Sequence, residues 1–429
     1  MNLRIEKKYI TFVLLYFATM VILCVDVLDD FSPYTNQIRK IRFVYIGVML
    51  IWYFLSMKNH NAEDRLSRKS NIVIVLGLIH SVLFGFILTN DIVAGLSHAH
   101  GIGMVFYYFI PVLLTLTYVY ENDLLLTYSY ATYAAVMVQL ILAAASNPNH
   151  FVNPLSYVRV FSNSSRVKFD FGFTTYGYTA HYCVFALLVS LFIFDILRRE
   201  GKLKNNIKPI MLIGLGDMIA LLILFSSAGR SGILTLVIVC AVYFGGLWLT
   251  KCTKENRRII LIALVLLLAL IIVYLAVSGG FDRIWANSNR SLNITVNYPI
   301  FKQMGNIWTG MGFVENSNFQ ATRANNFTSA FGVRTSSLDM YYVYLYFTTG
   351  IIGCILIGTA LIYILYQLIK NIGKPQALFG LALYVGWLFY GFWQCNIFTY
   401  RYYSPWFYLV VLLHIVDSFQ KTNSMEKKE

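Results

Sequence analysis

The chain has 429 residues, of which 58% are hydrophobic and only 13% are charged, and its mean hydropathy is +0.62. This composition excludes a typical soluble enzyme, because so few charges cannot cover that much apolar surface. The formal net charge of +14 does not predict a nucleic-acid partner, since the sequence contains no basic soluble module to hold one.

Apolar runs of about 20 residues recur along the whole chain, and each is long enough to cross a bilayer as a helix. The runs do not alternate with period two, so helices rather than barrel strands are predicted. We therefore expect an all-α polytopic membrane protein, with residues 1–429 forming a single integral membrane domain. About twelve transmembrane helices are predicted, near 9–28, 41–57, 71–89, 102–120, 124–145, 174–196, 209–227, 231–249, 259–278, 340–369, 377–393 and 402–417.

The distribution of Lys and Arg predicts the orientation of these helices. With the N-terminus inside, the cytoplasmic segments hold 21 of the 34 basic residues, so both termini are expected to face the cytoplasm. The six cysteines are scattered and form no CxxC pair, which predicts neither a disulfide framework nor a zinc site. No metal and no cofactor are predicted.

Two of the predicted extracytoplasmic segments are long. One covers residues 146–173, and the other is a loop of about 60 residues, 278–339, between the ninth and tenth spans. The longer loop is rich in Asn, Ser, Thr, Gly and aromatic residues, a composition that suits carbohydrate and also suits an ordinary polar loop.

The short segment SSAGRSG (226–232) places Arg230 between two apolar runs. A charge there needs a partner, and two alternatives are open: an arginine anchored to lipid headgroups, or a fixed cation for an anionic ligand. Arginine suits the second role because its planar fork binds phosphate oxygens in bidentate fashion. If the next helix opens near Ser231, its dipole adds to the attraction.

Several motifs, in this order, resemble the superfamily of O-antigen polymerases and O-antigen ligases. They are RVKFDFGFTTYGYTAHY (166–182), SSAGRSGILTLVI (226–238), WTGMGF (308–313) and SSLDMYYVYLYFTTGIIG (336–353). The resemblance covers roughly residues 160–360 and the overall topology. It implies a metal-independent glycosyltransferase of the bacterial cytoplasmic membrane whose donor is a glycan on undecaprenyl pyrophosphate.

The resemblance also implies roles for individual residues. Arg230 and Arg290 would hold the pyrophosphate, with Arg283 as a further candidate. Where ligases of the superfamily carry a histidine, eleven residues before the first glycine of a GxxG, this chain has Asp339. That departure favours a polymerase over a ligase and leaves Asp339 and Glu315 as alternative general bases. We predict further substrate contacts from the basic and aromatic residues of the outer segments: Arg166, Lys168, Arg323, Arg334, Trp308 and Tyr341.

The expected activity is the joining of lipid-linked repeat units into O-antigen, capsule or exopolysaccharide, with membrane lipids around the protein and a chain-length regulator and a flippase as partners. A glycan ligase, a flippase or other transporter, and a cell-wall glycan polymerase are the alternatives. Asp217, within an apolar run, fits either a transporter or a hydrogen-bonded structural acid. His98 and His100 lack a third metal ligand, and His80 and His181 are expected to be packed and hydrogen-bonded.

Overall fold

In the computed structural model, every named secondary-structure element among the described residues is helical, and one isolated antiparallel bridge joins Asn306 and Gly310. The described residues are 16, 44, 47–48, 51, 55, 68–88, 101–151, 169–173, 176–253, 255–256, 270, 273, 294, 298, 301–302, 305–312, 340–394, 397–399 and 403–425. The predicted all-α class is thereby confirmed for this part of the chain.

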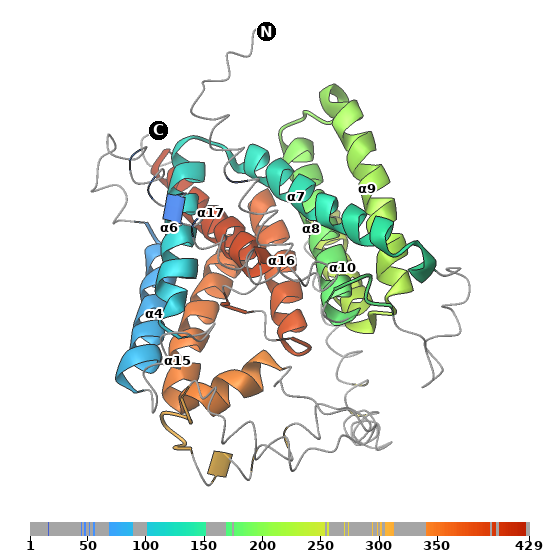
Figure 1. Cartoon of the computed structure of the whole chain (residues 1–429). Helices are drawn as coiled ribbons and strands as arrows, with labels where there is room; N and C mark the ends of the chain where they lie inside the picture. Colours follow the sequence, from blue (N-terminus) through green and yellow to red (C-terminus); the bar gives the residue numbers. More distant parts are fainter. Residues whose placement is uncertain are drawn as a thin grey trace.

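The named α-helices are α4 (Asn71–Val82), α6 (Ile110–Glu121), α7 (Leu125–Ser146), α8 (Tyr176–Arg199), α9 (Ile207–Ser226), α10 (Arg230–Lys251), α15 (Tyr341–Lys370), α16 (Pro375–Gly391) and α17 (Tyr403–Met425). Two π-helical segments adjoin them: η2 (Leu83–Ile87) follows α4, and η3 (Val105–Phe109) precedes α6. Short 3₁₀ turns lie at η4 (Pro148–His150) and η6 (Lys204–Asn206). Figure 1 shows these helices gathered into one bundle.

Five of the described helices are long and apolar enough to cross a membrane: Leu125–Ser146, Gly177–Arg199, Lys204–Ser226, Arg230–Lys251 and Tyr341–Lys370. They agree with the spans predicted near 124–145, 174–196, 209–227, 231–249 and 340–369. The spans predicted near 71–89, 102–120, 377–393 and 402–417 also contain helices. The runs 9–28, 41–57 and 259–278 lie largely outside the described residues, so the count of twelve stays a prediction.

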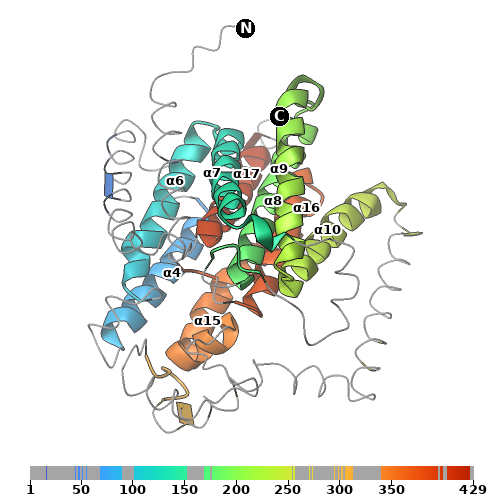
Figure 2. The same ribbon diagram turned by 45° about the vertical axis from the view of Figure 1, so that its right-hand side comes forward.

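Burial separates a central helix from peripheral ones. In α8, 89% of the most apolar window is buried, against 28% in the span that contains α9 and 22% in α10. Met211, Leu212 and Leu215 of α9 are each more than 60% exposed, which suits a surface that faces lipid tails. Figure 1 shows α9 at the right-hand edge of the bundle, and Figure 2 shows the molecule with that side turned forward.

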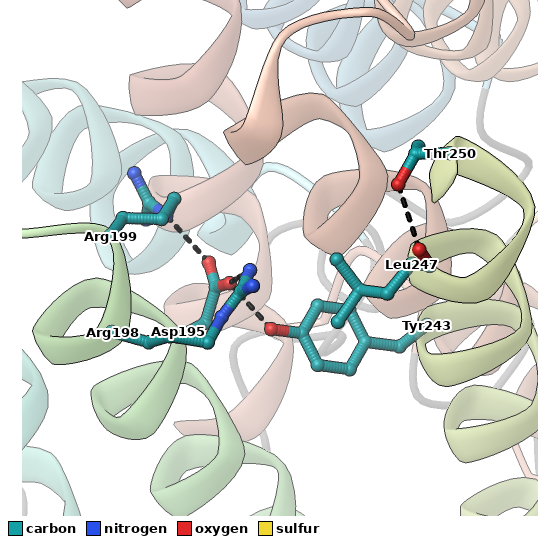
Figure 3. A network of polar contacts seen from close by, with 6 residues as sticks. All are labelled: Asp195, Arg198, Arg199, Tyr243, Leu247 and Thr250. Carbon is teal, nitrogen blue, oxygen red and sulfur yellow. Dashed lines mark hydrogen bonds and ion pairs between the residues drawn. The ribbon is translucent and has the colours of Figure 1, made fainter. Parts of the chain in front are cut away.

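The carboxylate of Asp195 joins α8 to α10 near one end of the bundle. It is fully buried and accepts hydrogen bonds from Arg199 at 2.8 Å, Arg198 at 3.1 Å and the Tyr243 hydroxyl at 2.5 Å. Figure 3 shows the three donors converging on this side chain. A buried charge is tolerated when such partners satisfy it. The network therefore fixes the register of α10 against α8.

Arg68 anchors the start of α4 by a second network. Its guanidinium lies 3.1 Å from Glu121 and 4.7 Å from the centroid of the Tyr120 ring. The backbone N–H of Ser70 donates to the Asp417 carboxylate at 3.0 Å, so an acid of α17 sits at the positive end of α4. Both contacts tie the beginning of α4 to the end of α6 and to the second half of α17.

These two networks lie at the same end of the bundle. Lys374 donates to the Phe419 carbonyl at 3.3 Å, and Phe379 of α16 lies against Tyr243 with ring centroids 5.6 Å apart. Arg68, Arg198, Arg199 and Lys374 come from segments whose charges predict a cytoplasmic position. The predicted alternation of cytoplasmic and extracytoplasmic segments thus agrees with the described helices. Which end of the bundle faces the cytoplasm stays a prediction.

We expect Asp195→Asn to lower the stability of the protein by about 2 kcal/mol, because the amide cannot accept from three donors as a carboxylate does. The matched control is Glu200→Gln, which removes the exposed Lys202–Glu200 pair next along the chain. That change should cost less than about 1 kcal/mol. The measurement is the temperature at which half of the monodisperse protein peak is lost when the protein is heated in detergent. Equal shifts for the two variants would contradict the structural role of Asp195.

Candidate functional site

Arg230 lies at the first position of α10, directly after a tight turn from α9. α9 ends at Ser226, and the connection consists of residues 227–229. The Arg230 side chain is exposed. The sequence-based expectation of a turn of about three residues, with this arginine at the end of the helix pair, is confirmed, although the helix begins one residue before Ser231.

The turn is this tight because of its backbone conformation and its neighbour on α8. Ala228 has a φ of +52°, a left-handed conformation that shortens the connection. A Cβ added at Gly229 would lie 2.2 Å from the Cβ of Ala180, so the glycine lets the turn sit directly on α8. This packing fixes the position of Arg230 relative to the start of α8.

The beginning of α10 carries positive charge. Its first turn holds Arg230 and no acidic residue, and its N-cap residue, Gly229, has no side chain that could accept hydrogen bonds from the first amides. The first amide groups of a helix carry partial positive charge, which normally attracts acidic side chains. A guanidinium beside these amides gives a local field that suits a phosphate-like anion.

Next to this turn, α8, α10, α16 and α17 meet around a small cavity. It is lined by polar and aromatic side chains that include His181, Thr235, Trp387 and Tyr390. His181 forms a hydrogen bond with Ser404, as the sequence led us to expect of a packed histidine, and its ring lies 4.8 Å from the ring of Tyr390. These contacts hold the adjoining ends of α8, α16 and α17 together next to the turn that carries Arg230.

A second element of the site is a short hairpin, residues 305–312, which contains most of the motif WTGMGF. Its ends pair as the Gly310 N–H donates to the Asn306 carbonyl at 2.6 Å and the Asn306 N–H donates back at 3.0 Å. The Asn306 side chain caps the turn by accepting from the Trp308 N–H at 2.8 Å. Asn and Gly are the residues that such a turn favours.

The hairpin is bound to a break in α15. At Gly350 the backbone has φ +60° and ψ −160°, a conformation that interrupts the helix and that glycine alone adopts readily. Figure 1 shows α15 changing direction near the bottom of the view, close to the hairpin. Two of the four motifs on which the predicted family resemblance depends thus lie against each other.

Backbone hydrogen bonds across this break replace those that the helix loses. Two amides that follow the break donate to hairpin carbonyls, and two carbonyls that precede it accept from hairpin amides. The bonds run from Ile351 to Ile307 (3.0 Å), Ile352 to Trp308 (3.0 Å), Met311 to Phe347 (2.8 Å) and Gly312 to Thr348 (2.9 Å). The interruption leaves these four groups paired, as a membrane domain requires.

Two sequence-predicted substrate residues lie at this element. Trp308 is 58% exposed, so its indole is accessible for the substrate contact that was predicted from sequence. Tyr341 begins α15 and is only 2% exposed, and it lines a cavity under the break instead of an open surface. The neighbouring Tyr342 donates to the Leu388 carbonyl at 2.7 Å, which attaches the first half of α15 to α16.

The hairpin and Arg230 lie at the same end of the bundle, opposite the Asp195 and Arg68 networks. Leu388 is three residues from the end of α16, and Tyr390, two residues further on, donates to the Gly177 carbonyl at the start of α8, at 3.1 Å. Ala180, one turn further, touches Gly229. A chain of contacts therefore connects the broken helix with the arginine.

The remaining predicted site residues lie outside the described part of the chain. They are Arg290, Asp339, Glu315, Arg283, Arg166, Lys168, Arg323 and Arg334, together with His98 and His100. Their roles stay predictions. Within the described residues, no group of three or more His, Cys, Asp or Glu side chains is arranged to hold a metal ion.

Asp217, the acid within a predicted span, is hydrogen-bonded. Its carboxylate accepts from the Ser190 hydroxyl at 2.7 Å and from the Tyr133 hydroxyl at 3.0 Å, on α8 and α7 respectively. Of the two alternatives open from sequence, these contacts favour a structural acid that joins three helices.

Sequence reasoning missed the break at Gly350 and the Asp195 network. The glycine in TTGIIG signalled the first only weakly, because a glycine within an apolar run is often tolerated in a straight helix. The second had a clearer signal, since Arg198 and Arg199 follow Asp195 at helical spacings of three and four residues.

No protein-family model matches this chain, and no curated protein matches it closely enough to indicate a relative. The resemblance to O-antigen polymerases therefore depends on the short motifs, two of which pair in space.

We expect Gly350→Ala and Gly310→Ala each to destabilise the protein by about 3 kcal/mol or more. An alanine at either position must adopt a strained positive φ, which costs about 1–2 kcal/mol, and further hydrogen bonds are lost when the hairpin moves. The added Cβ would lie 2.5 Å from the Trp308 carbonyl carbon in the first variant and 2.4 Å from that of Thr348 in the second.

The control for these variants is Gly358→Ala, because Gly358 lies on the same helix and a Cβ there meets nothing within 4 Å. Thermal unfolding in detergent should leave this variant at or above the wild-type midpoint. A Gly350→Ala protein with the wild-type midpoint would show that the break does not require glycine.

Proposed function

We propose that this protein polymerises a surface polysaccharide: it joins undecaprenyl-pyrophosphate-linked oligosaccharide repeat units at the outer face of the bacterial cytoplasmic membrane. The observation that carries the proposal is the pairing of WTGMGF with the TTGIIG break of α15, at the end of the bundle where Arg230 is exposed at a helix N-terminus. Broken helices in membrane proteins occur where backbone lines a binding site or is held by protein.

The reaction is a glycosyl transfer with inversion. A hydroxyl of the acceptor sugar attacks the anomeric carbon of the donor, the bond to the pyrophosphate oxygen breaks, and undecaprenyl pyrophosphate leaves with the bonding electrons. Negative charge grows on the leaving oxygen in the transition state, so preorganised cations next to it accelerate the step. Arg230, supported by the α10 N-terminus, takes this role, together with Arg290.

The proton of the attacking hydroxyl needs a base. Asp339 and Glu315 are the candidates, because a carboxylate within hydrogen-bonding reach of the hydroxyl performs general base catalysis. Trp308 supplies an exposed aromatic face for a sugar ring, and the basic side chains of the long loop extend the anionic subsite. The arginines neutralise the pyrophosphate, so the proposed mechanism uses no metal.

The proposed topology places the α9–α10 turn and the hairpin outside and the Asp195 and Arg68 networks inside, with both termini in the cytoplasm. A flippase that delivers lipid-linked units and a chain-length regulator are the partners that the family resemblance implies.

The test is complementation of a deletion strain with wild type, Arg230→Ala or the control Lys251→Ala. The control removes an exposed cation from the other end of the same helix. At equal protein level, we expect Arg230→Ala to reduce polymer synthesis by about 10²-fold or more, because a lost transition-state donor has an effect of that size. On a gel of extracted glycan, single repeat units replace the ladder, whereas Lys251→Ala keeps it.

Other outcomes point elsewhere. Lipid-linked units trapped inside the cell would indicate a flippase, and polymer that stays on its lipid would indicate a ligase. An unchanged ladder with Arg230→Ala would remove this arginine from the active site.

A further inference from the structure

A small cavity lies under the break in α15, away from the exposed Arg230. Its walls come from α4 (His80 and Ser81), the segment around η3, the first half of α15 (Tyr341, Tyr344 and Leu345), and other apolar side chains including Phe398. The cavity volume is about 10 Å³, which is the space needed for a single water molecule.

Three irregular helical segments contain, or lie within a few residues of, side chains that line this cavity. The π-helical segment η2 begins two residues after Ser81, η3 ends at the cavity-lining Phe109, and the Gly350 break lies five residues after Leu345. π-Helical turns inside α-helices are rare and occur frequently at functional sites. Their gathering around one cavity indicates that the cavity is a built feature of the fold.

His80 supplies the polar group of this cavity. Its side chain is 6% exposed, and among the described residues its Nε2 has no hydrogen-bond partner. A buried polar atom of this kind costs free energy unless a partner is bound. His181 differs in this respect, because its Nε2 pairs with Ser404.

A second polar atom flanks the same point of α15. A Cβ built on Gly353 would lie 3.3 Å from His80 Nε2 and 2.0 Å from Thr349 Oγ1. The Thr349 hydroxyl donates to the Leu345 carbonyl at 2.7 Å, so its oxygen still has an acceptor lone pair. When the neutral His80 ring carries its proton on Nδ1, its Nε2 is an acceptor, and a ligand between the two side chains then meets two acceptors.

We propose that one water molecule binds at the edge of this cavity, between His80, which lines it, and Thr349, and donates one hydrogen bond to His80 Nε2 and the other to Thr349 Oγ1. Water matches the size of the cavity and supplies the two donors that the acceptors need. The site gives the membrane domain an internal hydrated base beside the broken helix. This inference is independent of the proposed polymerase activity.

The test is water-to-nitrogen magnetisation transfer by solid-state NMR on the full-length protein in lipid bilayers, with ¹⁵N-labelled histidine. Of the seven histidines, His80 alone follows an isoleucine, so carbonyl-labelled isoleucine assigns its signal without mutation. We expect transfer from water to His80 Nε2, and weaker transfer to the Nε2 of His181, which is already paired with Ser404. A His80 signal as isolated from water as that of His181 would overturn the proposal.

Gly353→Ala tests the position of the water. The added methyl group occupies the point between Thr349 and His80, so transfer to His80 should fall to the level of His181. Gly358→Ala, with no atoms near its Cβ, should leave the transfer unchanged. Full transfer to His80 in Gly353→Ala would place the water elsewhere and contradict the site.

Discussion

The backbone of a membrane helix can be interrupted only where other groups take over its hydrogen bonds, and the pairing of residues 305–312 with the break in α15 meets this constraint. The hairpin replaces two donors and two acceptors at once. Phe301 stacks on Phe347 with ring centroids 5.0 Å apart, and Met311 completes a small apolar cluster between the two segments. Part of the long predicted loop is thereby attached to the membrane domain at a defined place.

The rest of the described structure follows from the same requirement applied to charges. Asp195, Asp217 and Asp417 are acids on apolar helices, and each accepts hydrogen bonds from a neighbouring helix. These contacts fix the registers of the described helices against one another. Arg230 differs from them by its exposed position on a helix N-terminus, which is why we propose a ligand role for it and not for the acids.

Much of the fold could be predicted from the sequence, because apolar runs of membrane-spanning length have one dominant solution. The turn at Arg230 could also be predicted, since two such runs are separated by only a few residues. The break at Gly350 could not, because its cause lies about 40 residues away in the hairpin that pairs with it. The burial of Tyr341 has the same origin: the bend of α15 decides which face of the first half is covered, and no local pattern encodes that bend.

The most direct test of the account is reconstitution of the purified protein in liposomes with its lipid-linked repeat unit as the only substrate. Free undecaprenyl pyrophosphate and glycan length are measured together in the presence of a chelator. The account predicts chains of several repeat units, with one undecaprenyl pyrophosphate released for each bond formed. Movement of the repeat unit across the bilayer without bond formation would contradict it and identify a transporter.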